Sequence, residues 1–451
     1  MSVTVDSAST TEMNVFQRLK LHPTGFWFVF WGELAERASF YGMRTILALY
    51  LTTVLLYEKS EGAAVMQFFI AACYVGPLFG GWLADRVLGR YKTILYFSVP
   101  YIIGHLVLGG IQSRPAMFFA LFLLALGSGS IKPNTSTLMG AIYDEQKKSF
   151  LLTEAFSYFY AAINIGAAVS SLFLPLVRDK YGYGIALGIP AALMVFAFGF
   201  FAMGKRYYPK ENVKNLPKKT VAQRKAEWQT LTRIAGIFGL ISVFWLVYDQ
   251  SASTWIYFAK DHCNLNLWPG FSVTPDQIQG VNPVLVVMLT PVFNGIWEMW
   301  KKRRGGSEVP DTRKMLIGFV IVIACMAMMA WAGYQAVGTE KVSVWWMVIA
   351  TFIITLSELC ISVVGLEFAY KQAAPGTKSV VTAAFLFTVT IGDFAGGFVD
   401  RWYETSMGAG SYFALQTVIM IIAGALFIGV ARRFEKKEGK ASLGKRAAAP
   451  A

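Results

Sequence analysis

Four ionisable side chains lie within one long apolar stretch, residues 26–57. They are Glu33, Glu36, Arg37 and Arg44, and a helix places them, together with Tyr41, within about 140° of its circumference. A membrane span needs only about 20 residues, so the stretch is long enough to cross a bilayer. Each charge costs at least about 2.5–3.5 kcal/mol at the bilayer centre, so this stripe must face protein or a water-filled cavity. It indicates a site for protons or charged solutes; the alternative is a salt-bridge network that only holds helices together.

The composition predicts the elements that position this stripe. The chain has 451 residues, of which 55% are hydrophobic and 15% charged, which is typical of an all-α polytopic membrane protein. Eleven further apolar segments follow the first, at about 64–84, 93–111, 115–142, 150–177, 183–204, 231–259, 276–300, 313–336, 343–370, 379–402 and 408–431. We therefore expect 12 transmembrane helices in two six-helix bundles, an organisation found in transporters built from repeats.

The basic residues predict orientation and domain boundaries. The formal net charge of +14 would suit nucleic-acid binding in another class of protein, but here Lys and Arg gather in the termini, in alternate loops and in the linker. Such a bias marks the cytoplasmic side, so both termini are expected inside, and no cleaved signal peptide is recognised. The expected domains are a cytoplasmic N-terminal segment 1–24, bundles 25–204 and 230–434, a cytoplasmic basic linker 205–229, and a cytoplasmic tail 435–451.

Three charged residues are expected near the membrane midplane. From the rise of a helix, Arg37 lies about 18 Å from the cytoplasmic start of its span, and Lys132 and Glu358 lie about 24 Å and about 21 Å from the outer ends of theirs. Two cations of the first bundle and one anion of the second would make a cavity between the bundles bipolar. Such a cavity suits a zwitterion, with its carboxylate at the cations and its ammonium group at the anion. A Lys132–Glu358 ion pair that locks the bundles is the alternative.

Other polar residues within the spans could line the same space or form helix–helix contacts. These are Tyr74, Asn164, Tyr257 and Asn282. Arg44 and Asp249 lie at similar depths in different bundles, so we expect them to form an outer gate pair. Asp393 has no predicted partner.

The sequence argues against an enzyme or a receptor. His22, His105 and His262 are scattered, and the cysteines Cys73, Cys263, Cys325 and Cys360 have no metal-ligand or disulfide spacing. We expect no metal, no cofactor and no nucleic-acid partner. The apparent absence of a sizeable soluble domain disfavours a receptor.

Several segments resemble one transporter family. Residues Gly80 to Arg90 resemble the loop signature between helices 2 and 3 of the major facilitator superfamily. The first span, from Glu33 to Gly42, is similar to the ExxERFxYYG motif of proton-dependent oligopeptide transporters, the POT/PTR family. Further matches surround Lys132, Asn164, Asp249 and Glu358, so the resemblance covers nearly the whole chain.

The resemblance implies the major facilitator fold and proton-coupled symport of di- and tripeptides by alternating access. Arg37 and Lys132 would bind the peptide carboxylate and Glu358 its amino group. The remaining implied roles are pocket residues Phe40, Tyr41, Tyr74, Asn164, Asn282 and Phe385, proton-coupling residues Glu33, Glu36 and Glu358, and a gate salt bridge of Arg44 with Asp249. We expect the peptide's carboxylate to draw the two cations away from these carboxylates and so to permit their protonation.

This chain departs from the family motif at two positions, where Ala38 and Phe40 replace a phenylalanine and a tyrosine. Phe385 stands where a tryptophan is common. The Phe40-Tyr41-Gly42 ending and the short linker are closer to the plant branch, so a carrier of nitrate or another small organic substrate is the alternative, as is a drug/proton antiporter. We expect a functional monomer in a bacterial inner membrane, driven by the proton gradient.

Overall fold

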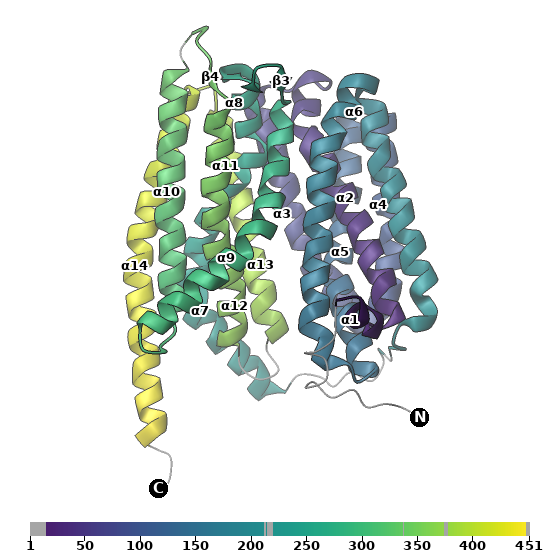
Figure 1. The fold of residues 1–451 in the computed structure, drawn as a ribbon, viewed down its shortest axis with the longest axis vertical. Helices are drawn as coiled ribbons and strands as arrows, with labels where there is room; N and C mark the ends of the chain where they lie inside the picture. Colours follow the sequence, from purple (N-terminus) through teal and green to yellow (C-terminus); the bar gives the residue numbers. More distant parts are fainter. Residues whose placement is uncertain (1–14, 212, 214–219, 337, 374–377, 448–451) are drawn as a thin grey trace. The chain divides into compact units, whose positions relative to one another are not determined.

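The computed structural model describes residues 15–211, 213, 220–336, 338–373 and 378–447, which are almost entirely helical (Figure 1). The α-helices are α1 (Val15–Leu21), α2 (Thr24–Thr53), α3 (Lys59–Leu83), α4 (Arg90–Gly110), α5 (Arg114–Glu145), α6 (Leu152–Met203), α7 (Val221–Tyr248), α8 (Thr254–His262), α9 (Val281–Arg303), α10 (Asp311–Gln335), α11 (Trp345–Glu358), α12 (Val364–Gln372), α13 (Lys378–Val399) and α14 (Ala409–Ala447).

Short elements connect these helices. Two are π-turns, η1 (Ala84–Leu88) and η7 (Leu359–Val363). Five are 3₁₀ turns, η2 (Ser149–Leu151), η3 (Gly204–Tyr207), η5 (Asp249–Ala252), η6 (Pro275–Gly280) and η8 (Asp400–Trp402). Strand β1 (Cys263–Asn264) pairs in parallel with β4 (Val342–Ser343), and β2 (Asn266–Trp268) forms an antiparallel pair with β3 (Phe271–Ser272).

Twelve membrane-spanning helices account for the described chain. Ten helical stretches are long and apolar enough to cross a membrane. One of them contains α6, whose 52 residues turn at Gly182, where φ is +83°, so α6 supplies two crossings. The twelfth is α2, which is 30 residues long but carries the four charged residues of the ionic stripe. The predicted all-α, twelve-helix membrane fold is therefore confirmed.

Several helix ends differ from those that the hydropathy pattern predicts. Part of the linker predicted at 205–229 is helical, because α7 begins at Val221. Thr220 and Gln223 cap that helix reciprocally, which stabilises a polar first turn that an apolar pattern does not reveal. Helix α14 likewise continues to Ala447, beyond the predicted bundle end at 434, and α1 lies within the predicted N-terminal segment.

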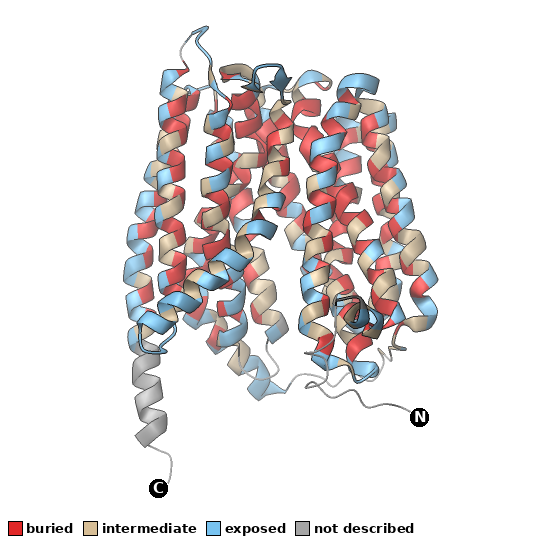
Figure 2. Cartoon of the chain, in the orientation of Figure 1, coloured by how far each residue is buried: buried red, intermediate tan, exposed pale blue. Residues whose placement is uncertain are grey.

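The chain forms two compact units. The first comprises residues 1–43, 76–170 and 177–216, and the second comprises 44–75, 171–176 and 217–451. The outer turns of α2 and the first part of α3 thus pack with the later helices, whereas the predicted boundary runs through the linker. Around helices such as α10 and α14, buried residues alternate with exposed ones, whereas few residues of α2 are exposed (Figure 2).

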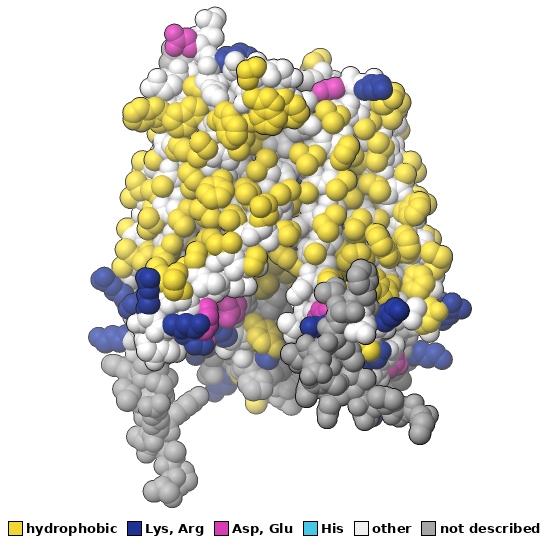
Figure 3. All heavy atoms as spheres, in the orientation of Figure 1, with side chains coloured by type: hydrophobic (Ala, Val, Ile, Leu, Met, Phe, Trp, Pro, Cys, Tyr) yellow, Lys and Arg dark blue, Asp and Glu magenta, His cyan; other side chains and the backbone are white. Residues whose placement is uncertain are grey.

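Exposed apolar side chains cover the flanks of the helices, as expected for lipid-facing surfaces (Figure 3). On the second unit, Lys and Arg gather where α9 ends and α10 begins (Figure 3), and Lys301, Lys302 and Arg303 form the last turn of α9. Basic residues also stabilise a helix C-terminus by interacting with its dipole.

One end of the second unit holds an ionic cluster. The Lys59 ammonium contacts Asp261 at 2.6 Å and Glu404 at 2.5 Å, and His262 Nε2 lies 2.7 Å from the Glu404 carboxylate. Burial raises the pKa of Glu404, but hydrogen bonds from His262 and Lys59 outweigh this effect and bring the pKa to about 2. The cluster ties α3, α8 and the segment after η8 together.

This depressed pKa predicts a pH-dependent stability. The contribution of Glu404 is fully present above its unfolded pKa of 4.5 and is lost as pH falls towards about 2. Glu404→Gln should therefore lower the melting temperature at neutral pH, by the equivalent of about 1–2 kcal/mol, and should reduce the loss of stability between pH 4.5 and 2. Thermal unfolding in detergent measures both effects, with the exposed Glu308→Gln as the matched control. Equal acid sensitivity in wild type and Glu404→Gln would contradict the assignment.

Candidate functional site

The ionic stripe of α2 forms a buried cluster in the first unit. Arg37 Nε lies 3.0 Å from Glu33 and 2.5 Å from Glu36. Glu33 is one helical turn before Arg37, so the helix itself aligns this pair. The side chains are at most 2% exposed, and Arg37 Nη2 makes no hydrogen bond within the described residues. Two carboxylates thus surround one guanidinium, which retains a donor for a further acceptor.

Phe40 and Tyr41 continue the same helix face. The Phe40 ring is buried, its centroid lies 5.9 Å from the Arg37 guanidinium carbon, and it meets Tyr41 edge-on. Because a cation over an aromatic face is stabilised, Phe40 holds Arg37 without a hydroxyl group. Helix α6 packs closely here, since a Cβ on Gly166 would lie 2.7 Å from the Leu34 carbonyl oxygen. Asn164, two residues earlier, donates to the Tyr160 carbonyl at 2.9 Å.

Two further helices contribute to this cluster. Lys132 on α5 is half-buried and interacts electrostatically with Glu36, while its predicted role beside Arg37 stays a prediction. The Tyr101 side chain on α4 also interacts with the Glu36 carboxylate, and the Tyr101 ring stacks on the His105 ring. Tyr101 and His105 were not among the predicted site residues. Their spacing of four residues on one apolar helix was the available signal.

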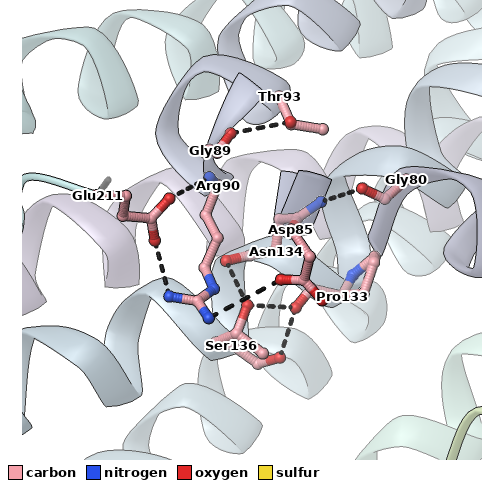
Figure 4. A network of polar contacts seen from close by, with 10 residues as sticks. Gly80, Asp85, Gly89, Arg90, Thr93, Pro133, Asn134, Ser136 and Glu211 are labelled. Atoms are coloured by element: carbon pink, nitrogen blue, oxygen red, sulfur yellow. Dashed lines mark hydrogen bonds and ion pairs between the residues drawn. The ribbon is translucent and has the colours of Figure 1, made fainter. Parts of the chain in front are cut away.

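The superfamily-like loop forms a separate network in the first unit (Figure 4). Arg90 Nη1 lies 2.7 Å from Glu211, and the Arg90 backbone N–H donates to the other oxygen of Glu211. The carboxylate therefore caps the N-terminus of α4 and pairs with its first side chain. Asp85 lies 4.0 Å from Arg90, and Asn134 donates to the Gly80 carbonyl at 3.2 Å. The network joins the α3–α4 loop to α5 and to the segment after α6.

Glu358 is held in the second unit by a polar side chain of another helix. Asn282 Nδ2 donates to Glu358 Oε2 at 2.9 Å and lies at the same distance from the Thr355 hydroxyl. Tyr248 on α7 contacts the same carboxylate. The π-turn η7 begins directly after Glu358, and such turns are frequent at functional sites. The predicted residues Glu358 and Asn282 thus lie together, with Tyr248 as an addition.

The predicted pair of Arg44 and Asp249 is present in the second unit. Arg44 Nη2 lies 2.5 Å from Asp249 Oδ1, and both side chains are largely buried. Asp393 on α13, for which no partner was predicted, contacts Asp249 and interacts with Arg44. Its interaction partners come from α2 and η5, which sequence separation alone does not reveal. The pair's role as a gate stays a prediction.

The remaining predicted residues are placed as follows. Tyr74 on α3 is half-buried. The Tyr257 hydroxyl donates to the Ala48 carbonyl at 3.0 Å. This favours a helix–helix contact over the alternative, a place in the lining of a cavity. Phe385 is buried, packs edge-on against Phe238, and its ring lies 2.5 Å from where a Cβ on Gly365 would be. Roles for Tyr74 and Phe385 in a pocket stay predictions.

Twelve membrane-spanning helices with charged residues buried among them define a multi-pass membrane protein of the major facilitator fold. The sequence model of the POT family (PTR2) matches residues 91–224 and 213–411. The chain belongs to the POT family, and the predicted resemblance is confirmed.

Named relatives and solved structures agree with this family. The chain is 34% identical to "Peptide transporter family 1" of Drosophila melanogaster over 61% of this chain and 43% of the relative. It is 27% identical to "Uncharacterized transporter YclF" of Bacillus subtilis, with 90% and 93% covered. The crystal structure of the POT family transporter PepTSo superposes with a TM-score of 0.82 at 27% identity, covering 92% of this chain and 99% of that one. The chain spans about half the length of the animal relatives, such as 50% of "Peptide transporter 3" of Caenorhabditis elegans.

Proposed function

We propose that the chain is a proton-coupled symporter that imports di- and tripeptides by alternating access. The observation that carries this proposal is the buried cluster on α2, in which Glu33 and Glu36 share Arg37. Carboxylates that depend on one cation for their charge become proton acceptors when a ligand takes that cation. Two of the relatives are named as peptide transporters, which supports the substrate class.

The peptide's two charged ends have complementary partners. Its carboxylate would bind Arg37, whose Nη2 makes no hydrogen bond within the described residues, and Lys132. Its ammonium group would bind Glu358, which Asn282 orients at 2.9 Å. Phe40, Tyr41, Tyr74, Asn164, Asn282 and Phe385 would contact the rest of the peptide.

Proton coupling would follow from competition for these cations. As the peptide carboxylate approaches Arg37 and Lys132, their attraction for Glu36 and Glu33 weakens, and those carboxylates take up protons. Glu358 would be neutralised in the same way by a bound ammonium group or by a proton. The site then moves with fewer uncompensated charges, which lowers the cost of reorganising it within the membrane.

The proposal also covers the membrane in which the chain acts and its oligomeric state. The chain would act as a monomer in a cell inner membrane with both termini in the cytoplasm, as the positions of Lys and Arg indicate. The proton gradient would supply the energy, without a cofactor. Peptide would leave the protein unchanged, so the activity would be transport and not catalysis.

Uptake of labelled dialanine into proteoliposomes tests this function, with and without an inward proton gradient. Gradient-dependent accumulation of dialanine but not of nitrate is expected. Because Ala38 and Phe40 provide no hydroxyl group, the second candidate is a carrier of nitrate or another small organic substrate. Accumulation of nitrate without dialanine would favour that candidate, and no accumulation of either would contradict proton-coupled import of both.

The Arg44–Asp249 pair is proposed as the outer gate. Removing one partner of a buried ion pair costs about 3–5 kcal/mol, because the other charge is left uncompensated. Arg44→Ala and Asp249→Ala should therefore each lower dialanine uptake by at least about tenfold. The double exchange Arg44→Asp with Asp249→Arg should recover part of the uptake, and a double-mutant cycle measures the coupling. No recovery in a folded double variant would mean that the pairing is not required.

A further inference from the structure

Asp393 is a buried carboxyl group that the proposed mechanism does not use. It lies on α13 directly after Gly392, where α13 packs closely on α7: a Cβ on Gly392 would lie 2.3 Å from the Ser242 carbonyl oxygen. The Asp393 side chain is 0% exposed. Neither of its oxygens receives a hydrogen bond from a donor within the described residues. A carboxylate in this environment would be a charge without solvation, which costs far more than a neutral acid.

The neighbours of Asp393 define its protonation state. Its carboxyl group contacts Asp249, and the positive charge nearby belongs to Arg44, which is already 2.5 Å from Asp249. Asp400, at the end of the same helix, adds a further carboxyl group. Helix α3 contributes Gln67, which lies beside Gly396 and does not titrate.

The other charged groups around this pair have partners of their own. Glu358, which also interacts with Asp249 and Arg44, accepts hydrogen bonds from Asn282 and Tyr248. On α12, Glu367 and Lys371 pair with each other at 2.6 Å. Asp400 accepts hydrogen bonds from Gln250 and Tyr412. The Arg44 guanidinium therefore lies near two carboxyl groups that contact each other, those of Asp249 and Asp393. Two carboxylates in contact cannot both stay charged beside a single cation.

We propose that Asp393 and Asp249 form a carboxyl pair that binds one proton beside Arg44, and that a second proton taken up by this pair releases Arg44. The inference rests on the proposed proton-coupled transport. The first proton lies on Asp393, whose O–H donates to an Asp249 oxygen, so that the pair carries one negative charge and Arg44 balances it.

The second proton arrives from hydronium in the water on the accessible side. An O–H bond of hydronium breaks, an O–H bond forms on Asp249, and a water molecule is left. Both carboxyl groups are then neutral, and Arg44 loses its ion pair. Asp393 is thus a proton-binding residue of the gate, which sets the pH at which Asp249 is neutralised.

The test compares the pH profile of dialanine uptake in proteoliposomes for wild type and Asp393→Asn, at a constant proton gradient. An amide N–H stabilises the Asp249 carboxylate less than an acid O–H does, and asparagine cannot carry the second negative charge. Asp393→Asn should therefore shift the midpoint of the profile by about one pH unit towards alkaline pH, a tenfold change in proton affinity. An unchanged midpoint in a folded Asp393→Asn protein would overturn the proposal.

Two further variants separate proton sharing from packing. Thr388→Val removes a buried hydroxyl group of α13 that lies 3.1 Å from Trp245 Nε1, and it should leave the midpoint unchanged. With Asp249→Asn, Asp393 can ionise and pair with Arg44, so part of the pH dependence that this pair contributes should persist. That part should be lost in Asp249→Asn with Asp393→Asn, which leaves only the pH dependence of the other carboxylates. Identical profiles of that single and double variant would contradict a shared proton.

A spectroscopic measurement keeps the inference separate from the proposed function. Infrared spectra of purified wild type at neutral pH should contain a C=O band of a protonated carboxyl group that Asp393→Asn lacks. If wild type shows no proton-dependent uptake, the proposed function fails, while this band still tests the pair. A spectrum without any difference would overturn the pair itself. Asp393→Ser, which retains a hydroxyl donor, replaces Asp393→Asn if the latter does not fold.

Discussion

The variant Glu36→Gln is expected to exchange dialanine across the membrane but not to accumulate it against its gradient. Glu36 is 0% exposed, and its charge depends on Arg37 at 2.5 Å and on Lys132. Glutamine has the same size but could not take up the proton that Glu36 would bind in the proposed mechanism, when a peptide carboxylate occupies these cations. A hydrogen bond to a charged group contributes about 1.5–3 kcal/mol, so concentrative uptake should fall by roughly 10- to 100-fold.

Counterflow measures the retained exchange, and uptake driven by an imposed proton gradient measures the lost accumulation. Glu154→Gln is the matched control, because Glu154 also pairs with an arginine of the first unit, Arg18, at 2.6 Å, but lies at a less buried position. It should accumulate dialanine as wild type does. If Glu36→Gln accumulates dialanine with an unchanged pH dependence, Glu36 is not the coupling carboxylate.

The variant Glu358→Gln is expected to lose discrimination between dialanine and N-acetyl-dialanine. Glutamine keeps the shape of Glu358 and the contact with Asn282, which lies at 2.9 Å, but it removes the negative charge that would bind the peptide ammonium group. Loss of a buried charge-assisted contact of about 2–5 kcal/mol should raise the KM for dialanine by at least about 30-fold. The acetylated peptide has no ammonium group, so its weaker transport should change little.

Initial rates for both peptides give this ratio directly. Glu367→Gln is the control, since Glu367 lies nine residues further along, is exposed and pairs with Lys371. A Glu358→Gln protein that still prefers dialanine by the wild-type factor would place the ammonium group elsewhere.

The sequence predicts local charge groups well because a single helix fixes them. The spacing from Glu33 to Arg37 places both side chains on one face, and the structure pairs them at 3.0 Å. The depth of Arg44 and Asp249 follows in the same way from helical rise, and this pair is also present. In each case, counting residues along a span is enough.

Contacts that depend on the rotation of one helix against another could not be predicted. Asp393 contacts Asp249 from a helix 144 positions further along, and an almost uniformly apolar helix gives no pattern that fixes its rotation. The spacing of Tyr101 and His105 places them on one face of α4, but it does not show that this face turns towards Glu36. The turn at Gly182 was predicted as a break between spans, but the π-turns at 84–88 and 359–363 leave no hydropathy signal.

The π-turn after Glu358 changes the geometry of the helix that follows it. A π-turn holds one residue more than an α-turn, so every later side chain is rotated by about 100° from its place in an uninterrupted helix. With this offset, the buried face of α12 contains Val364, Gly365, Phe368 and Ala369, and the Phe368 ring meets Phe434 of α14 at 5.3 Å.

Because of the same extra residue, the side chains up to Glu358 and those after Val363 have orientations that are set separately. Deleting one residue from 359–363 would restore regular hydrogen bonding but would turn Phe368 away from α14, whereas the carboxylate of Glu358, which precedes the turn, would stay aligned with Asn282. The chain thereby sets the orientation of the half-helix that carries Glu358 independently of the half-helix that packs against α14.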